Sequence, residues 1–208
     1  MKKLIGYGHA TFSVAATEHS KKHEEQARRT YAAYMNYVSH TGLTVQPSGL
    51  TLHPTMSFLG ASSDGHVHDP CMNPPDGLLE IKCPFSIDNV DVRSLPPVEI
   101  ARRFGSKFCL SLNSDGGLEL NRAHKFFTQV QGELAVMQRP WADFVVYTLA
   151  PADNIFVQRI KADSVFWKDV LLPELVKFYT SALVPELLLR RVQQGLALFP
   201  VEHDEEEH

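Results

Sequence analysis

One apolar run with an acid and a base embedded in it constrains the fold of this chain more than any other stretch. The segment GLLEIKCPF carries Glu80 and Lys82 in otherwise apolar sequence, which predicts a buried strand around 78–81. Side chains alternate along a strand, so Glu80 and Lys82 share one face while Ile81 points to the other. Ionisable groups are costly to bury, and these two therefore need each other, a metal ion or a substrate.

A second apolar run, 56–61, lies shortly before this one, and the segment between them is rich in Pro, Gly, Asp and His. The pattern predicts a strand, a loop and a second strand, with Asp64 at the end of the first strand. If the two strands pair, Asp64 joins Glu80 and Lys82. Two carboxylates and water suit Mg²⁺, which prefers oxygen ligands. A lysine beside them can position an attacking water or neutralise developing charge.

The rest of the chain alternates helical and extended patterns. Amphipathic periodicity predicts helices over about 17–40 and 122–138, and a hairpin is expected around the turn NSDGG. The run ADFVVYTL predicts a buried strand beside the central one, and NIFVQRIKAD predicts another. From about 163 to 191 the pattern is helical, with breaks expected at Pro173 and Pro185.

Four motifs in order resemble one known family. The spacing from SSDG to EIK matches the PD-(D/E)xK nuclease pattern, with Ser63 in the place of the usual proline. LGASSDG, GLLEIKCPFS, HKFFTQVQGELAV and WADFVVYT look like the YqaJ viral recombinase domain, the lambda-exonuclease-like family. That family's helix spacing Glu-x-x-Ala-x-x-x-Tyr is met by Glu24, Ala27 and Tyr31. The resemblance runs from about Ala16 to Leu188, most of the chain.

This resemblance implies a fold and a function. The implied fold is α/β (α+β), restriction-endonuclease-like, with a mixed central sheet flanked by helices. The implied function is Mg²⁺-dependent hydrolysis of DNA phosphodiester bonds, as a 5′-to-3′ exonuclease on double-stranded ends in viral-type recombination, with Mn²⁺ as the alternative ion. The implied partners are double-stranded DNA, a single-strand annealing protein, and further copies of the chain in a toroidal trimer.

The resemblance also assigns the acidic residues. Asp64 and Glu80 are the expected metal ligands, joined by the carbonyl of Ile81 and by Glu24. Lys82 is expected to orient or deprotonate the water and to stabilise the pentavalent charge. From the residues alone, Glu24 could equally be a solvated acid in the first turns of its helix, where the dipole favours it.

Two polar residues are expected to contact the substrate phosphate, namely Gln131 and Ser62. Gln131 shares a helix face with Phe127 and Leu134, and a glutamine on a largely apolar stripe needs partners. From the residues alone it could satisfy a backbone carbonyl, whereas the resemblance favours holding the phosphate or positioning Lys82. Ser62 lies on the same side of an extended chain as Asp64, and a turn-forming role is equally open.

Length and composition narrow the class of protein to which this chain can belong. The 208 residues, of which 44% are hydrophobic, fit one nuclease domain over 1–200, followed by an acidic tail over 201–208 that we expect to be disordered. No apolar run approaches the roughly 18–20 residues that span a membrane. The odd number of cysteines, 3, favours a reducing compartment and thus an intracellular location, in cytoplasm or nucleus. The net charge of −4 does not itself indicate a nucleic-acid binder, although a basic groove can be local.

Two other functional classes stay open. One is a structure-selective endonuclease on the same core, and the other is a non-catalytic relic that binds nucleic acid or a partner. The retained trio of Asp64, Glu80 and Lys82 argues against the relic. The family usually carries an Arg/Ser-containing segment for the 5′-phosphate before the helix that holds Glu24, and none is evident here, so polarity rests on the resemblance alone.

Overall fold

The structure is a computed structural model that describes residues 15–87, 90–92, 95–105, 108–149 and 154–197. The chain divides into two compact units, one of Ser13–Ser164 and the other of Met1–Phe12 with Val165–His208. The expected acidic tail, 201–208, lies outside the described residues.

A mixed five-stranded sheet forms the centre of the larger unit, in the order β1-β4-β5-β8-β9. Only the pairing of β5 with β8 is parallel, and the other three pairings are antiparallel. The strands are β1 (Thr44–Gln46), β4 (Gly65–His68), β5 (Asp76–Lys82), β8 (Trp141–Thr148) and β9 (Asn154–Lys161). The predicted α+β fold with a mixed central sheet is therefore confirmed.

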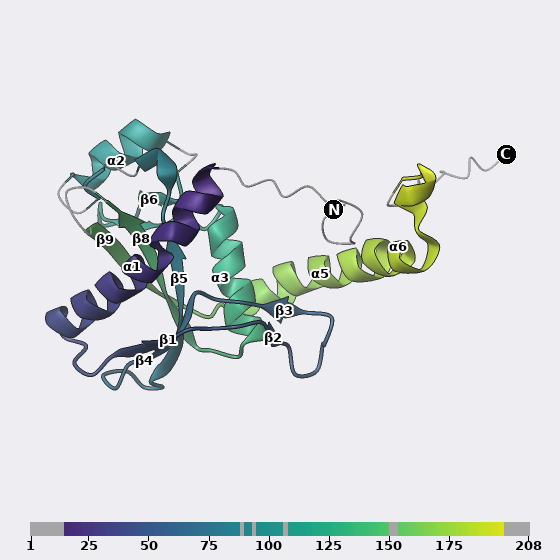
Figure 1. Cartoon of the computed structure of the whole chain (residues 1–208), viewed down its shortest axis with the longest axis horizontal. Helices are drawn as coiled ribbons and strands as arrows, with labels where there is room; N and C mark the ends of the chain where they lie inside the picture. Colours follow the sequence, from purple (N-terminus) through teal and green to yellow (C-terminus); the bar gives the residue numbers. More distant parts are fainter. Residues whose placement is uncertain (1–14, 88–89, 93–94, 106–107, 150–153, 198–208) are drawn as a thin grey trace. The chain divides into compact units, whose positions relative to one another are not determined.

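Two helices flank this sheet, α1 (Ala15–Val38) and α3 (Lys125–Val136) (Figure 1). Ala27 and Tyr31 of α1 belong to one buried cluster with Leu79 and Ile81 of β5. The alternate residues of β5, Glu80 among them, face α3. Both faces of the central strands are covered, which explains why β8 reads as a nearly continuous apolar run and is buried along its whole length.

The pairing of strands around Asp64 differs from the prediction. The strand before it, β3 (Gly60–Ala61), pairs with β2 (Thr51–Leu52), whereas the strand that pairs with β5 is β4, which follows Asp64. The sequence of β4, GHVH, was expected to belong to a loop because His and Gly surround its one apolar residue. Close packing explains the glycine, since a Cβ on Gly65 would lie 2.9 Å from Val45.

A buried ionic network lies on the α1 face of the sheet. The guanidinium of Arg159 donates to both carboxylate oxygens of Asp143, at 2.8 and 2.7 Å, and to Asp69 at 2.9 Å. Both aspartates have no exposed surface. The hydroxyl of Tyr31 donates to Asp143, and the ring of His40 contacts Asp69. Charges buried this deeply persist because they are paired.

The smaller elements lie between β5 and α3 in the chain and include the hairpin predicted around NSDGG. They are the short helix η1 (Phe85–Ile87), helix α2 (Pro97–Phe104), and the hairpin of β6 (Leu110–Leu112) and β7 (Leu118–Leu120). All three cysteines are free thiols. Within the described part of the chain, no helix is both long enough and apolar enough to cross a bilayer.

From Ser164 the chain forms successive helical segments, and a new α-helical segment begins one residue before each of the two prolines at which breaks were predicted. The segments are α4 (Ser164–Phe166), η3 (Trp167–Leu171), α5 (Leu172–Phe178), η4 (Tyr179–Leu183), α6 (Val184–Leu189) and η5 (Arg191–Gln194). A π-helical segment ends two residues before each proline. A proline amide cannot donate and its ring crowds the preceding turn, and a widened turn accommodates both effects without ending the helix.

Candidate active site

The acid and the lysine of β5 meet on one face of the strand, as predicted. The Nζ atom of Lys82 donates to Oε1 of Glu80, and the Glu80 side chain is only 2% exposed. The same ammonium lies 4.5 Å from the centre of the Phe126 ring, at the start of α3. A buried carboxylate is thus held beside a cation that retains some access to solvent, since the Lys82 side chain is 18% exposed.

Asp64 is attached to the same strand through the backbone. Its Oδ2 accepts a hydrogen bond from the Ile81 amide at 2.6 Å, and its own amide donates to the Leu79 carbonyl at 2.9 Å. Burial raises the pKa of Asp64, although the hydrogen bond from Ile81 opposes this effect. The structure therefore brings Asp64 to β5, as predicted, by way of β4 and not by the strand before it.

Helix α1 contributes Glu24 and, one turn further on, Arg28. The Arg28 guanidinium donates to Glu24 at 2.9 Å and to the Asp64 carbonyl at 3.1 Å. Partial burial raises the pKa of Glu24, and the negative charge of Asp64 raises it further. Glu24 is therefore close enough to Asp64 to feel its charge. Sequence reasoning did not identify Arg28 as the link between them, although its position four residues after Glu24 was a signal.

Helix α3 supplies two polar residues that sequence reasoning missed, Gln129 and Glu133. The Gln129 amide nitrogen donates to Oε1 of Glu80 at 2.7 Å and to Oε1 of Glu133 at 2.8 Å. Glu133 is 5% exposed. Its spacing of four residues from Gln129 places both on one helix face.

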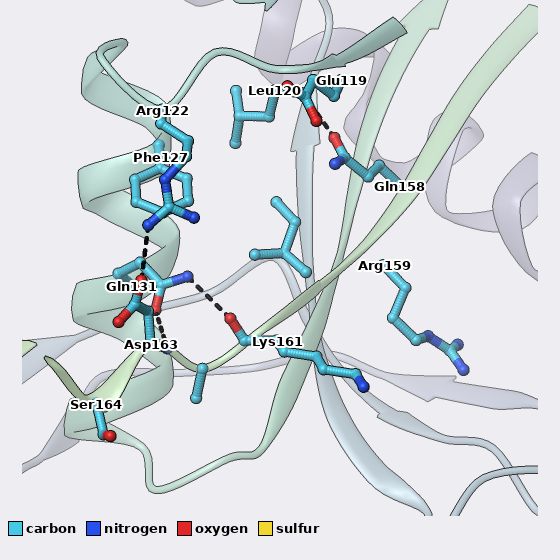
Figure 2. Close-up of a pocket in the computed structure, with 12 residues that line it drawn as sticks. Glu119, Leu120, Arg122, Phe127, Gln131, Gln158, Arg159, Lys161, Asp163 and Ser164 are labelled. Carbon is cyan, nitrogen blue, oxygen red and sulfur yellow. Dashed lines mark hydrogen bonds and ion pairs between the residues drawn. The ribbon is translucent and has the colours of Figure 1, made fainter. Parts of the chain in front are cut away.

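Gln131 lies elsewhere, and its prediction as the glutamine beside Lys82 is corrected. Its amide nitrogen donates to the Lys161 carbonyl at 3.0 Å, and its oxygen accepts from the Asp163 amide at 2.7 Å. Figure 2 shows these two bonds at the side of a pocket, where Arg122 also pairs with Asp163 at 2.7 Å. The carboxamide is occupied by backbone at the end of β9, which is the alternative that the residues alone had left open.

Ser62 is exposed and lies two residues before Asp64, where the proposed phosphate contact stays a prediction. Its neighbour Ser63, at the position where the family pattern has proline, is buried and donates to the Gly65 carbonyl at 3.2 Å. Ser63 thus stabilises the turn that leads into β4.

The site carries more negative than positive charge. Burial raises the pKa of Glu80, and the nearby charge of Asp64 raises it further against the opposing effect of Lys82. Burial also raises the pKa of Glu133, and the charge of Glu80 adds to that rise. Both carboxyl groups are therefore harder to ionise than exposed acids, chiefly because they are buried.

The cluster's donor set fits a divalent cation that prefers oxygen ligands. Among the described residues, Oε2 of Glu80 is buried without a hydrogen-bond partner, which is unusual for a carboxylate oxygen in a folded protein. In the structure, Glu80 pairs with Lys82 and Glu24 pairs with Arg28. The part of the chain that the structure describes contains no group of three His, Cys, Asp or Glu side chains that could hold a metal ion. Asp64 and Glu80 are the side chains that would hold a divalent cation. The backbone carbonyl of Ile81, the residue after Glu80, would complete the set.

Known proteins resemble this chain in both sequence and fold. The crystal structure of LHK-Exo in complex with dAMP has a TM-score of 0.62 and 26% identity, covering 93% of this chain and 80% of that one. A second crystal structure, of an alkaline exonuclease (LHK-Exo) from Laribacter hongkongensis, has a TM-score of 0.60 and 27% identity, covering 94% and 81%. No curated protein matches the sequence. The model of the YqaJ-like viral recombinase domain matches residues 3–140, and the chain belongs to that family.

Proposed function

We propose that the protein is a Mg²⁺-dependent DNA exonuclease that acts on double-stranded ends in viral-type recombination, with 5′-to-3′ polarity. The observation that carries this proposal is the pairing of Glu80 with Lys82 on one face of a buried strand, with Asp64 bound to the amide between them. Membership of the YqaJ-like family supports it, as does the likeness to LHK-Exo, an alkaline exonuclease crystallised with dAMP.

The residues have separable roles in this proposal. Asp64, Glu80 and the Ile81 carbonyl would hold Mg²⁺, with Glu24 beside Asp64 as a further acid. The bound ion would polarise the phosphoryl group and lower the pKa of a bound water. Lys82 Nζ, which donates to Glu80 in the structure, can donate instead to the water or to a phosphate oxygen as charge develops there.

Other assignments rest on the family. Ser62 is a candidate for phosphate contact, and Gln129 takes the place that sequence reasoning gave to Gln131 beside the acidic cluster. We propose double-stranded DNA as the substrate, and Mn²⁺ as the ion that can replace Mg²⁺. An annealing protein as partner, a trimeric assembly and an intracellular location are proposals of the same origin.

Digestion of linear and closed-circular double-stranded DNA with Mg²⁺ tests the proposal. We expect loss of the linear DNA alone, and faster release of a 5′ label than of a 3′ label. Lys82→Met, which retains the length of the side chain without its charge, should reduce the rate by at least about 100-fold. Lys161→Met is the matched control, because this exposed lysine ends β9 away from the acidic cluster, and its rate should stay within about twofold of the wild type.

Three results would contradict the proposal. Cutting of the circle would indicate the endonuclease, and activity that survives Lys82→Met would place the chemistry elsewhere. Complete inactivity of a folded wild-type protein that still binds DNA would indicate the non-catalytic class.

A further inference from the structure

Glu133 is a buried acid on α3 that has no role in the reaction proposed above. Its side chain is 5% exposed, and its Oε1 accepts a hydrogen bond from Gln129. Its Oε2 is buried without a hydrogen-bond partner in the described part of the chain. A buried carboxylate oxygen without a partner lowers the stability of the fold. A positively charged or hydrogen-bond-donating group beside it would remove this cost.

The same condition holds for Glu80, the acid opposite. Glu80 is 2% exposed, and its Oε2 also has no hydrogen-bond partner among the residues that the structure describes. One amide nitrogen, that of Gln129, lies 2.7 Å from the Glu80 carboxylate and 2.8 Å from that of Glu133. Gln129 therefore holds the two carboxylates as neighbours on the same side of α3.

A bound cation between the two side chains would satisfy both oxygens together.

The charges of the cluster point the same way. The negative charges of Asp64, Glu80 and Glu133 act on one another, and the positive charge of Lys82 opposes them. A bound divalent cation would offset the repulsion between these carboxylates.

We propose that Glu133 contributes an oxygen to the same divalent cation that Glu80 binds, either directly or through a water on the ion. This inference rests on the proposed function, because that function requires the ion. It adds a ligand from helix α3. The other proposed ligands come from β5, from Asp64 just before β4, and from Glu24 of α1. The protein would then bind its ion more tightly than Asp64 and Glu80 alone allow.

Glu133→Gln separates the charge of this side chain from its packing. The glutamine oxygen can still accept from Gln129, and the substitution keeps the size and shape of the side chain. The variant should therefore fold as well as the wild type, which a thermal melt in EDTA would verify. Its deficit should concern the cation alone.

Isothermal titration of the full chain with Mn²⁺ alone, without DNA, provides the measurement. We expect Glu133→Gln to weaken Mn²⁺ binding by at least about tenfold and to reduce the Mn²⁺-induced rise in Tm. Glu174→Gln, at an exposed acid of α5, is the matched control and should bind like the wild type. Binding by Glu133→Gln within about twofold of the wild type would overturn the inference, and an ordered water would then satisfy Oε2.

Glu80→Gln distinguishes this inference from the proposed function. If Glu80→Gln loses Mn²⁺ binding while Glu133→Gln retains it, the inference alone fails. If both variants bind Mn²⁺ like the wild type, the ion is not held by this cluster, and the metal site of the proposed function fails with the inference.

Discussion

Replacing Gln131 with alanine should destabilise the fold and leave catalysis intact. The substitution removes two hydrogen bonds, to the Lys161 carbonyl and from the Asp163 amide, of a side chain that is 2% exposed. Each such bond contributes about 0.5–1.5 kcal/mol net. The two backbone groups lie in the exposed Lys161 and the half-buried Asp163, where water can replace part of the loss. We therefore expect the free energy of unfolding to fall by about 1–3 kcal/mol.

Urea unfolding followed by tryptophan fluorescence measures this loss, because Trp141 is buried in β8 of the same unit. With an m-value of about 2–3 kcal/mol/M, the midpoint should decrease by about 1 M. The rate of DNA digestion per folded molecule should stay within about twofold of the wild type.

Gln129→Ala is the matched comparison within the same motif. Its side-chain nitrogen donates to two carboxylates at the acidic cluster. We expect a stability change below about 1 kcal/mol and a rate lower by about tenfold or more. The reasoning is refuted if Gln131→Ala unfolds at the wild-type midpoint, or if it lowers the rate as far as Gln129→Ala does.

Two further measurements test the buried charges. Arg159→Ala leaves the unexposed Asp143 and Asp69 without their guanidinium, and the free energy of unfolding in urea should fall by about 3–5 kcal/mol. Arg159→Lys should recover less than half of that loss, because an ammonium cannot make the bidentate contact. Full recovery by the lysine would contradict the argument. Burial raises the pKa of Glu80 to about 7 and of Glu133 to about 9, so the folded state holds protons that the unfolded state releases above about pH 4.5. The Tm in EDTA should therefore decrease from pH 5.5 to pH 8.5, by less in Glu133→Gln, and a wild-type Tm that rises over this window would refute the assigned shifts.

The local part of the site could be predicted because it depends on the period of a single strand. Glu80 and Lys82 share a face in any strand that contains both, and Ile81 must point the other way. That Asp64 lies near them was also predicted correctly, but the pairing that brings it there was not. Strand pairing is non-local, and the short β4 offers one apolar residue, Val67, between two histidines.

The choice between Gln129 and Gln131 shows the same limit. Helical periodicity correctly placed Gln131 on the buried face of α3. What that face meets depends on the order of strands in the sheet, and at Gln131 it meets the end of β9. Glu133 was missed because an acid next to an apolar stripe usually faces solvent, and only the assembled sheet buries it against Glu80.

The hydrogen bond between Asp64 and the Ile81 amide has a consequence for hydrogen exchange. The paired part of β4 begins at Gly65, opposite Leu79, so a side chain and not a neighbouring strand protects this amide. Most amides of so central a strand exchange only when the whole unit unfolds. The Ile81 amide exchanges whenever the Asp64 carboxylate swings away, and its rate therefore reports, at a single position, how long that carboxylate stays in place.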